Sequence, residues 1–250
     1  MSAALKLQVA SKFSRASAQY LKHANVQKRS ADILLSSMNK KYGAMLDLGA
    51  GPMQHHSTLS EKSNTLVALD LSHSMLSQGP QSAYKVCADM DNLPFLANSF
   101  DCIFSNFAMQ WSGDLPKLLT KLHDVLKLGG RAHLSIVVDG SLREIATAWQ
   151  GVDEHCHVNK FIEFERLLAA ARAAGFSIRS VSKRCLVDMF DTPKAAMKSV
   201  KNIGANQLNS AENRRGLVGK KSYQTLLDSY PITDGCAHVS YEVAFLELTK

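Results

Sequence analysis

Long apolar runs are missing from this sequence of 250 residues. None approaches the roughly 18 residues that a helix needs to cross a bilayer, so we expect no contact with a membrane. The first residues also lack the apolar core of a signal peptide, because Lys6, Gln8, Ser11 and Lys12 interrupt their apolar stretch. These absences favour a cytoplasmic protein. The absence of an acidic residue before Asp32 leaves a transit peptide as a minor alternative.

Cysteines are few and scattered. Their number, five, is odd and no C-x-x-C pair occurs, which excludes a disulfide framework and favours reduced thiols. Histidine pairs occur at His55–His56 and on either side of Cys156, at His155 and His157. Neither pair has a matching Cys or His pair elsewhere, so we expect no metal site.

Acidic residues are outnumbered by basic ones, 22 to 29, which gives a formal net charge of +7. A basic chain favours an acidic partner. Dense runs of Lys and Arg interleaved with aromatic residues are absent, so we expect no nucleic-acid partner. Apolar residues make up 46% and charged residues 20% of the chain, which is typical of a globular protein with a buried core. The length fits one domain with elaborations, or at most two.

Stretches typical of buried strands alternate with stretches of helical periodicity. This alternation predicts an α/β fold with a mostly parallel sheet of seven strands and helices on both faces. Asp114 is the expected N-cap of the helix over 115–127, and Gly129–Gly130 its expected end. Helices are predicted over 17–38, 115–127 and 160–174, and strands over 44–48, 65–69, up to about 88, 100–105, 131–138, 178–187 and 241–248.

The stretch 191–234 breaks this alternation. It contains two further helical patterns, over 193–203 and 222–229, joined by a polar link. An insertion of this length before the last strand is expected to form a lid over the functional site rather than a structureless loop. We therefore expect a single domain over 1–250, with an N-terminal helical cap over 1–40 and a helical lid over 191–234.

The segment Met45–Gly51, M-L-D-L-G-A-G, predicts a buried strand that runs into a tight turn. Gly49 and Gly51 allow the backbone to turn sharply and to approach a ligand closely. A dinucleotide fingerprint would need a third glycine at Gln54, so a nicotinamide dehydrogenase is disfavoured. The spacing instead resembles the D-x-G-x-G loop of S-adenosylmethionine methyltransferases, with an ordinary strand and turn as the alternative.

Acidic residues follow three successive predicted strands. Asp47, Asp70 and Asp89 would line one edge of a parallel sheet, where open α/β sheets bind ligands. Asp70 is suited to accept the ribose hydroxyls of an adenosyl ligand, and Asp89 its adenine amino group, with Met90 against the ring. The alternatives are a helix N-cap or a solvated acid for Asp70 and a turn aspartate for Asp89.

The segment Ser105–Trp111, S-N-F-A-M-Q-W, would lie at the same sheet edge, between cofactor and acceptor. Asn106 and Gln110 offer polar contacts there. The apolar side chains of Phe107, Met109 and Trp111 would form walls of the site, or else pack in the core.

With these motifs, the chain resembles the malonyl-[acyl-carrier-protein] O-methyltransferases of biotin synthesis, a class I S-adenosylmethionine-dependent family, over most of its length. The loop D-L-G-A-G-P and the segment V-A-L-D-L-S-H-S-M-L are general signatures of class I methyltransferases. More specific are the N-terminal K-F-S-R-A-S-A-Q-Y-L-K-H-A-N-V-Q, then S-N-F-A-M-Q-W, D-G-S-L-R-E-I-A-T-A-W-Q-G-V-D and M-K-S-V-K-N-I-G-A. The chain departs from the family at Met53, where glycine is common, and a side chain there is expected to narrow the cofactor site.

The resemblance implies a Rossmann-like class I fold, the cofactor S-adenosyl-L-methionine with S-adenosyl-L-homocysteine as its product, and a monomer. It also implies methylation of the free carboxylate of malonyl-phosphopantetheine on an acyl carrier protein, which gives the methyl ester that primes pimelate assembly. The alternatives are a class I methyltransferase for another small molecule and a non-catalytic carrier-protein-binding relative. The implied cofactor-binding residues are Asp47, Gly49, Gly51, Asp70, Leu71, Met75, Asp89, Met90, Ser105 and Asn106.

A malonyl carboxylate has a pKa of about 4 and is ionised at neutral pH, so it needs no general base. It does need a partner that holds it once water is excluded. Arg143 is the first candidate and Arg15 the second, because a guanidinium pairs with both carboxylate oxygens. The alternative for both is a surface ion pair. Tyr20 and Gln110 would orient the acceptor. Basic residues suited to dock an acidic carrier gather in the expected lid: Lys194, Lys198, Lys201, Arg214, Arg215, Lys220 and Lys221.

Overall fold

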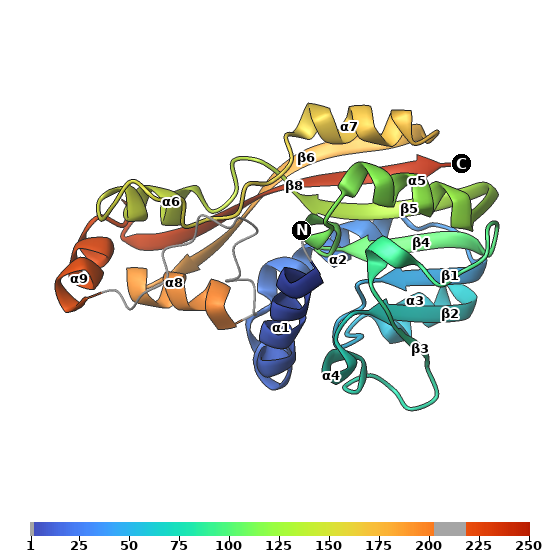
Figure 1. The fold of residues 1–250 in the computed structure, drawn as a ribbon, viewed down its shortest axis with the longest axis horizontal. Coiled ribbons are helices and arrows are strands. Elements are labelled where there is room, and N and C mark those ends of the chain that lie inside the picture. The colour runs from blue at the N-terminus through green and yellow to red at the C-terminus, as the bar shows by residue number, and fades with distance from the viewer. Residues whose placement is uncertain (1–2, 203–218) are drawn as a thin grey trace.

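The computed structural model describes residues 3–202 and 219–250, and it shows a twisted sheet from which two long strands extend (Figure 1). The strands follow the order β3-β2-β1-β4-β5-β8-β6, and the two-residue β7 pairs with β8. β1 to β5 are parallel, whereas β8 runs antiparallel between β5 and β6. The strands are β1 (Tyr42–Leu48), β2 (Ser63–Asp70), β3 (Tyr84–Cys87), β4 (Phe100–Asn106), β5 (Leu126–Val137), β6 (Ser177–Phe190), β7 (Ile232–Thr233) and β8 (Cys236–Thr249).

The topology places a crevice at the carboxyl ends of β1 and β4. Along the chain the strands run outward from β1 to β3, and then restart on the other side of β1 with β4. The strand order therefore reverses between β1 and β4, and the connections after these two strands leave the sheet in opposite directions. Open α/β sheets bind ligands in the crevice at such a reversal.

Helices cover both faces of the sheet because neighbouring strand residues point to opposite sides. On β1, Met45 packs in the cluster that includes Leu34 of α2 (Asn25–Ser37) and Leu59 of α3 (His56–Glu61). Leu46 packs in a second cluster with the helices α5 (Leu115–Val125) and α7 (Phe164–Ala173). The predicted α/β fold with helices on both faces is confirmed.

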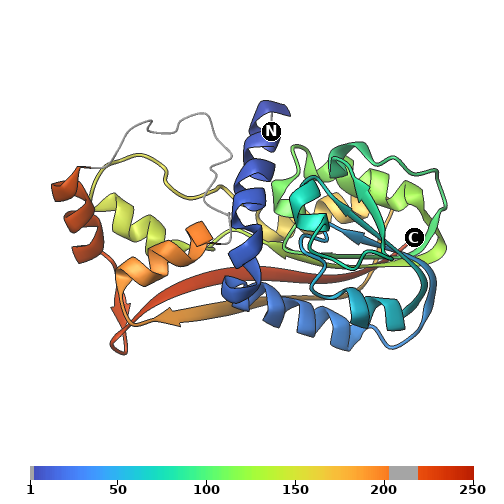
Figure 2. The ribbon, with the colours of Figure 1, turned by 90° about the horizontal axis from the view of Figure 1, so that it is seen from below.

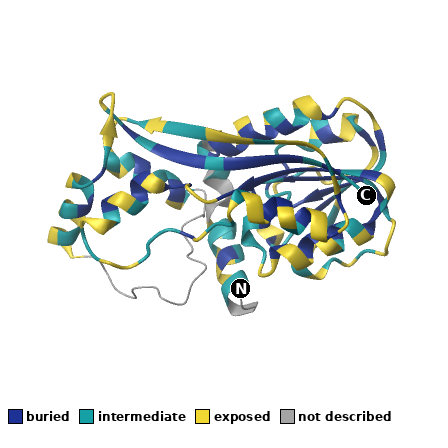
Figure 3. Cartoon of the chain, turned by 90° about the horizontal axis from the view of Figure 1, so that it is seen from above, coloured by how far each residue is buried: buried dark blue, intermediate teal, exposed yellow. Residues whose placement is uncertain are grey.

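The far ends of β6 and β8 carry a second group of helices, α6 (Arg143–Gln150), α8 (Pro193–Asn202) and α9 (Lys220–Asp228) (Figures 1 and 2). Their apolar residues continue the cluster on the α2 face, so both parts share one core. Figure 3 shows the buried stretch of β8 running through both parts. The described part of the predicted lid contains α8 and α9, while residues 203–218, with Arg214 and Arg215, lie outside the described residues.

The single helix predicted over 17–38 is wrong. The chain forms α1 (Ala3–His23) and α2, which are separated at Ala24, where φ is −88° and ψ is 44°. α1 therefore leaves the sheet and crosses between the sheet and the second group of helices (Figure 2). No described helix combines the length and the apolar character that a membrane span requires.

The predicted end of the helix over 115–127 is also wrong. Asp114 caps α5 by accepting the amide of Lys117 at 3.1 Å, as expected. The helix already ends at Val125, however, and Gly129 and Gly130 belong to β5. The β4–β5 register shifts between Phe100 and Cys102, and a Cβ on Gly130 would lie 2.7 Å from the carbonyl oxygen of Lys127. These glycines thus allow the irregular start of β5 and do not end the helix.

Candidate active site

The turn after β1 is shaped by two glycines in the left-handed region. Gly49 has φ +72° and Gly51 φ +54°. A Cβ on Gly49 would lie 2.2 Å from the Cβ of Ala108, so no side chain fits there. A Cβ on Gly51 would have no atom within 4 Å, because this residue borders open space. The loop therefore brings bare backbone to the edge of a cavity.

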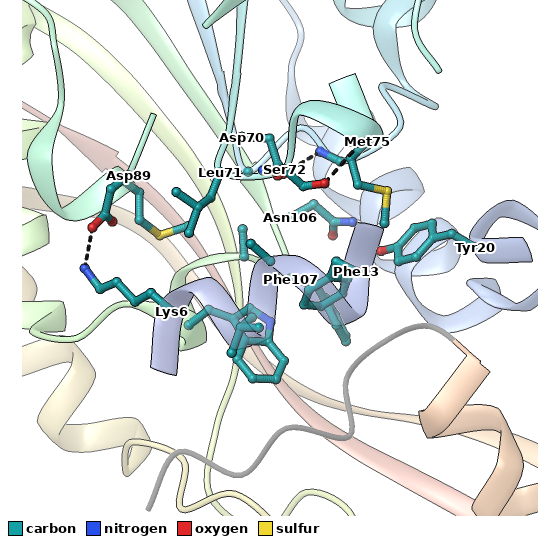
Figure 4. A pocket seen from close by; sticks show the side chains of 17 residues that line it. Lys6, Phe13, Tyr20, Asp70, Leu71, Ser72, Met75, Asp89, Asn106 and Phe107 are labelled. Carbon is teal, nitrogen blue, oxygen red and sulfur yellow. Dashed lines mark hydrogen bonds and ion pairs between the residues drawn. The ribbon is translucent and has the colours of Figure 1, made fainter. Parts of the chain in front are cut away.

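This cavity, here called the cofactor cavity, has about 750 Å³ of empty space and lies between the sheet edge and α1 (Figure 4). The sheet side is formed by residues that follow β1, β2, β3 and β4, and the opposite wall by one face of α1. Eight of the residues predicted to bind the cofactor line it, namely Gly49, Gly51, Asp70, Leu71, Met75, Asp89, Met90 and Asn106.

Asp70 lies at the end of β2, and both of its carboxylate oxygens accept backbone amides. Oδ2 accepts the amide of Gly51 at 2.9 Å, and Oδ1 accepts that of Ser72 at 2.7 Å. Burial raises the pKa of Asp70, and these hydrogen bonds oppose the rise. The N-cap of the short helix α4 (His73–Leu76) is Ser72 and not Asp70. Each carboxylate oxygen has a second lone pair, so Asp70 can still accept ligand hydroxyls.

Asp89 lies after β3 at the other end of the cofactor cavity. Its Oδ1 accepts the amide of Asp91 at 2.9 Å, which begins a short 3₁₀ helix (Met90–Asn92). Its Oδ2 accepts the ammonium of Lys6, from α1, at 2.7 Å. Asp89 is therefore a turn residue and a cavity residue at once.

Asp47 lines a smaller neighbouring cavity together with the glycine loop, Gln54 and His55. Burial and the nearby Asp70 carboxylate raise the pKa of Asp47 to about 7. Ser105 lines neither cavity: its buried hydroxyl donates to the carbonyl oxygen of Leu48 at 2.9 Å and fastens β4 to β1.

Met53 does not narrow the cofactor cavity, contrary to the expectation. It has φ +56° and is buried in a cluster with Ala68 and Leu76. Its sulfur lies where a Cβ on Gly79 would stand, 2.3 Å away, so Gly79 makes room for it. The side chain thus points away from the site, and the loop keeps its shape without a glycine at this position.

A second cavity with about 440 Å³ of empty space adjoins the first, and we call it the acceptor cavity. Phe13, Tyr20, Phe107 and Trp111 line both cavities. The acceptor cavity further includes Val137 and Leu142, an apolar wall near α6. Its polar side chains include Tyr20, Gln27, Gln110, Asn159 and Tyr241. None of its described lining residues is Lys or Arg.

Tyr20 and Gln110, both predicted at the acceptor, line this cavity. Burial and the Asp70 carboxylate raise the pKa of Tyr20 above its ordinary value, so its phenol stays protonated. Gln110 donates from Nε2 to the carbonyl oxygen of Phe107 at 2.7 Å, while its buried Oε1 has no hydrogen-bond partner. An unsatisfied buried oxygen is costly, which favours a ligand that donates to it.

The structure does not bring Arg143 or Arg15 to either cavity. Arg143 begins α6, and its guanidinium pairs with Glu242 at 3.1 Å and Glu144 at 3.4 Å, which is the surface ion pair of the alternative interpretation. Arg15 is exposed on α1. Apart from Tyr20, the side chains of α1 and α2 that line the cavities, above all Lys6 and Gln27, were not predicted, because they come from distant segments without a local motif.

Comparison with known proteins identifies the family to which this site belongs. A family model described as a methyltransferase domain matches residues 46–134, which span the glycine loop and β1 to β4. The chain is 35% identical to the malonyl-[acyl-carrier protein] O-methyltransferase of Pseudescherichia vulneris, over 97% of both chains. The chain belongs to this O-methyltransferase family. The chain is also 33% identical to the biotin biosynthesis bifunctional protein BioHC of Saccharophagus degradans. That protein is longer, and the chain spans only 47% of its length.

Solved structures show that the methyltransferase fold is shared more widely than the family. A putative methyltransferase from Bacillus halodurans superposes with a TM-score of 0.63 and 16% identity, covering 90% of this chain and 98% of the other. This likeness concerns the fold alone. The family membership rests on the relatives that match over nearly the whole chain, with α1, α6 and α8 included.

Proposed function

We propose that the chain transfers a methyl group from S-adenosyl-L-methionine to the free carboxylate of malonyl-acyl-carrier protein, as its relatives are named for doing. The match over 97% of both chains supports the reaction. The pair of adjoining cavities supports it as well, because one can hold the cofactor and the other the acceptor. The single observation that carries the proposal is that the acceptor cavity, lined by neutral hydrogen-bonding and apolar groups, adjoins the cofactor cavity, with Tyr20 and Phe107 lining both.

The cofactor cavity fits S-adenosylmethionine. Gly51 borders open space that a side chain would fill, so a ligand can approach the backbone there. Asp70 offers acceptors for the ribose hydroxyls, Asp89 an acceptor for the adenine amino group and Met90 an apolar contact for the ring. Asp47, Asn106 and the smaller cavity would receive the amino-acid part. When bound, the cofactor supplies a methyl group on a sulfonium sulfur, which a carboxylate oxygen accepts without a general base.

The protein's own contribution is to orient the carboxylate and exclude water from it. The protonated phenol of Tyr20 is positioned to donate to a carboxylate oxygen, and Gln27 and Asn159 supply further polar atoms. Phe107, Trp111, Val137 and Leu142 keep the remaining wall apolar. Positioning of this kind supplies much of the rate, on the order of 7–11 kcal/mol at best. Neutral donors therefore take the place that the sequence suggested for an arginine.

The helices α8 and α9 suit an acidic carrier protein. Lys194, Lys198 and Lys201 lie on α8, and Lys220 and Lys221 begin α9, on the side of the molecule beyond α1 (Figure 1). We propose that these helices act as the lid and receive the carrier, and that the enzyme works as a cytoplasmic monomer.

A methyl-transfer assay with mass detection of the ester tests the proposal. Malonyl-carrier protein, malonyl-coenzyme A and longer dicarboxyl thioesters are compared at equal concentration, and the malonyl-carrier ester is expected to form fastest. Methylation of an unrelated small acid in preference to these would favour the alternative acceptor. Absence of S-adenosylhomocysteine binding would favour the non-catalytic relative.

A further inference from the structure

One face of α1 forms the outer wall of the cofactor cavity along its length. Lys6, Val9, Ala10, Phe13 and Tyr20 recur at helical spacing and line it. Figure 4 shows Lys6 beside Asp89 at one end and Tyr20 at the other, across from Asp70 and Met75. A cofactor bound in this cavity would therefore be covered by α1 on one side.

Lys6 fastens the first turns of α1 to the loop after β3. Its ammonium contacts the carboxylates of Asp89, at 2.7 Å, and Asp91, and its side chain is only 13% exposed. The Asp91 carboxylate also accepts hydrogen bonds from the hydroxyl of Ser112 and from the amide of Gly113, the latter at 2.7 Å. The two carboxylates are therefore anchored on the sheet side, and Lys6 is the movable partner.

A second contact fastens the middle of α1. The hydroxyls of Ser14 and Ser72 are 2.7 Å apart, and the amide of Ser72 donates to Asp70 at 2.7 Å. Beyond Tyr20 the helix ends, and the backbone leaves helical geometry at Ala24 before α2 begins. α1 is thus joined to the sheet by a turn at one end and by the Lys6 ion pairs at the other.

We propose that Lys6 is a cofactor-retaining residue: its ion pairs with Asp89 and Asp91 hold α1 over the bound cofactor and set the rate at which the cofactor leaves. The proposal rests on the cofactor assignment made above. Asp89 can serve both partners, because each carboxylate oxygen has two lone pairs and Lys6 also binds Asp91. Lys6 is absent from the acceptor cavity, so it acts on retention of the cofactor and not on the acceptor.

The decisive measurement is the dissociation rate of S-adenosylhomocysteine from Lys6→Met, followed by stopped-flow change in the fluorescence of Trp111, which lines the cavity. We expect release about tenfold faster than from the wild type, the effect of losing a charge-assisted hydrogen bond. The turnover number at saturating cofactor is expected to rise in Lys6→Met if product release limits turnover.

Two variants make the result specific. Lys6→Arg keeps the charge and should restore slow release, whereas Gln8→Met places the same new side chain on an exposed position of α1 and should release the product as the wild type does. Hydrogen exchange of the α1 amides should quicken in Lys6→Met while that of α2 does not change. High salt should speed release from the wild type and leave Lys6→Met unaffected.

Equal release rates in the wild type and Lys6→Met would overturn the proposal, as would a lowered turnover number at saturating cofactor with unchanged release. The cofactor assignment fails in a different way, by absence of S-adenosylhomocysteine binding to the wild type, and the role of Lys6 would fall with it. Binding to the wild type together with unaltered release from Lys6→Met would reject the role of Lys6 alone.

Discussion

Tyr20 is the residue at which the site comes together. It lines the cofactor cavity, the acceptor cavity and the smaller cavity around Asp47. Burial keeps its phenol protonated, so it offers a hydrogen-bond donor where, in the proposed reaction, the methyl group and the carboxylate would meet. Its ring also packs near that of Phe13, with centroids 6.4 Å apart, which holds the hydroxyl in place.

Removal of the Tyr20 hydroxyl is expected to slow the reaction and to spare cofactor binding. Tyr20→Phe keeps the ring and loses the donor, and loss of one positioned donor lowers turnover by about a hundredfold. Steady-state kinetics with malonyl-carrier protein and equilibrium binding of S-adenosylhomocysteine measure the two effects. A turnover number unchanged in Tyr20→Phe would remove the phenol from the reaction.

Arg143→Ala is expected to retain most of its turnover, within about threefold, because surface ion pairs contribute little to the fold and the guanidinium lies outside the acceptor cavity. The same two assays apply. A folded Arg143→Ala with intact cofactor binding and no methylation would show that this arginine reaches the carboxylate after all.

At the residue scale, local motifs predicted the sheet side of the site, whereas the opposite wall was missed except for Tyr20. Gly49, Gly51 and Asp70 were found because a tight turn and a strand end impose them at fixed spacing. Lys6 lies 83 residues from Asp89, and such a contact leaves no pattern in the sequence. Arg143 follows a strand that points toward the site, but its guanidinium forms an ion pair with Glu242 of the neighbouring strand.

At the scale of elements, α6 is joined to β8 by a buried carboxylate. Glu144 accepts the amide of Ser240 at 3.0 Å and its hydroxyl at 2.5 Å. Leu142, which precedes α6 with φ +59°, lines the acceptor cavity. The position of this wall therefore depends on the Glu144–Ser240 contact.

Glu144→Ala is expected to lower the free energy of unfolding by about 2–4 kcal/mol, because it leaves a buried amide and a buried hydroxyl of Ser240 without partners. Denaturant unfolding of the wild type and the variant measures the difference. Glu144→Gln retains one acceptor oxygen and should lose about half as much. Identical unfolding midpoints in Glu144→Ala and the wild type would contradict this assignment.

The periodicity of apolar residues predicted which segments are helices and which are strands. It did not predict two boundaries, the break between α1 and α2 and the end of α5. The apolar spacing of α1 continues into α2, so nothing in it marks the break at Ala24. Gly129–Gly130 is typical of a helix end, yet pairing of Leu126 with Phe100 starts β5 earlier. β6 and β8 exceed their predicted lengths because their far halves carry α6 and α8, contacts that a strand pattern alone does not reveal.

At the scale of the whole molecule, a buried histidine connects the sheet to α2. His133 of β5 lies 2.9 Å from the hydroxyl of Tyr42 and 3.3 Å from that of Ser37. Burial, with the nearby charges of Arg131, Lys40 and Lys62, lowers the pKa of His133 to about 4. The folded protein thus holds it neutral at a pH at which the unfolded chain protonates it.

The stability that depends on neutral His133 is present above pH 6.5 and is lost as the pH falls toward 4, because only the unfolded state takes up the proton. The loss amounts to about 3 kcal/mol over this interval. Asp47 acts in the opposite direction, since its raised pKa favours the folded state as the pH falls below 7. Unfolding free energies of the wild type and His133→Phe between pH 7 and 4.5 isolate the histidine, and parallel pH profiles would contradict its role.

The charge of the molecule suits the acidic carrier protein of the proposed function. The five lysines of α8 and α9 form no ion pair with another described residue, and the net charge is +7. Attraction between exposed charges is screened by salt, since the Debye length falls from about 10 Å at 0.1 M to about 3 Å at 1 M. The KM for malonyl-carrier protein is therefore expected to rise about tenfold between 0.05 and 0.5 M salt.

The double variant Lys220→Gln with Lys221→Gln should weaken this salt dependence of KM, whereas Arg166→Gln with Arg172→Gln on the distant α7 should preserve it. If KM stays constant with salt, or if the α7 pair has the same effect as the α9 pair, carrier docking does not depend on these helices.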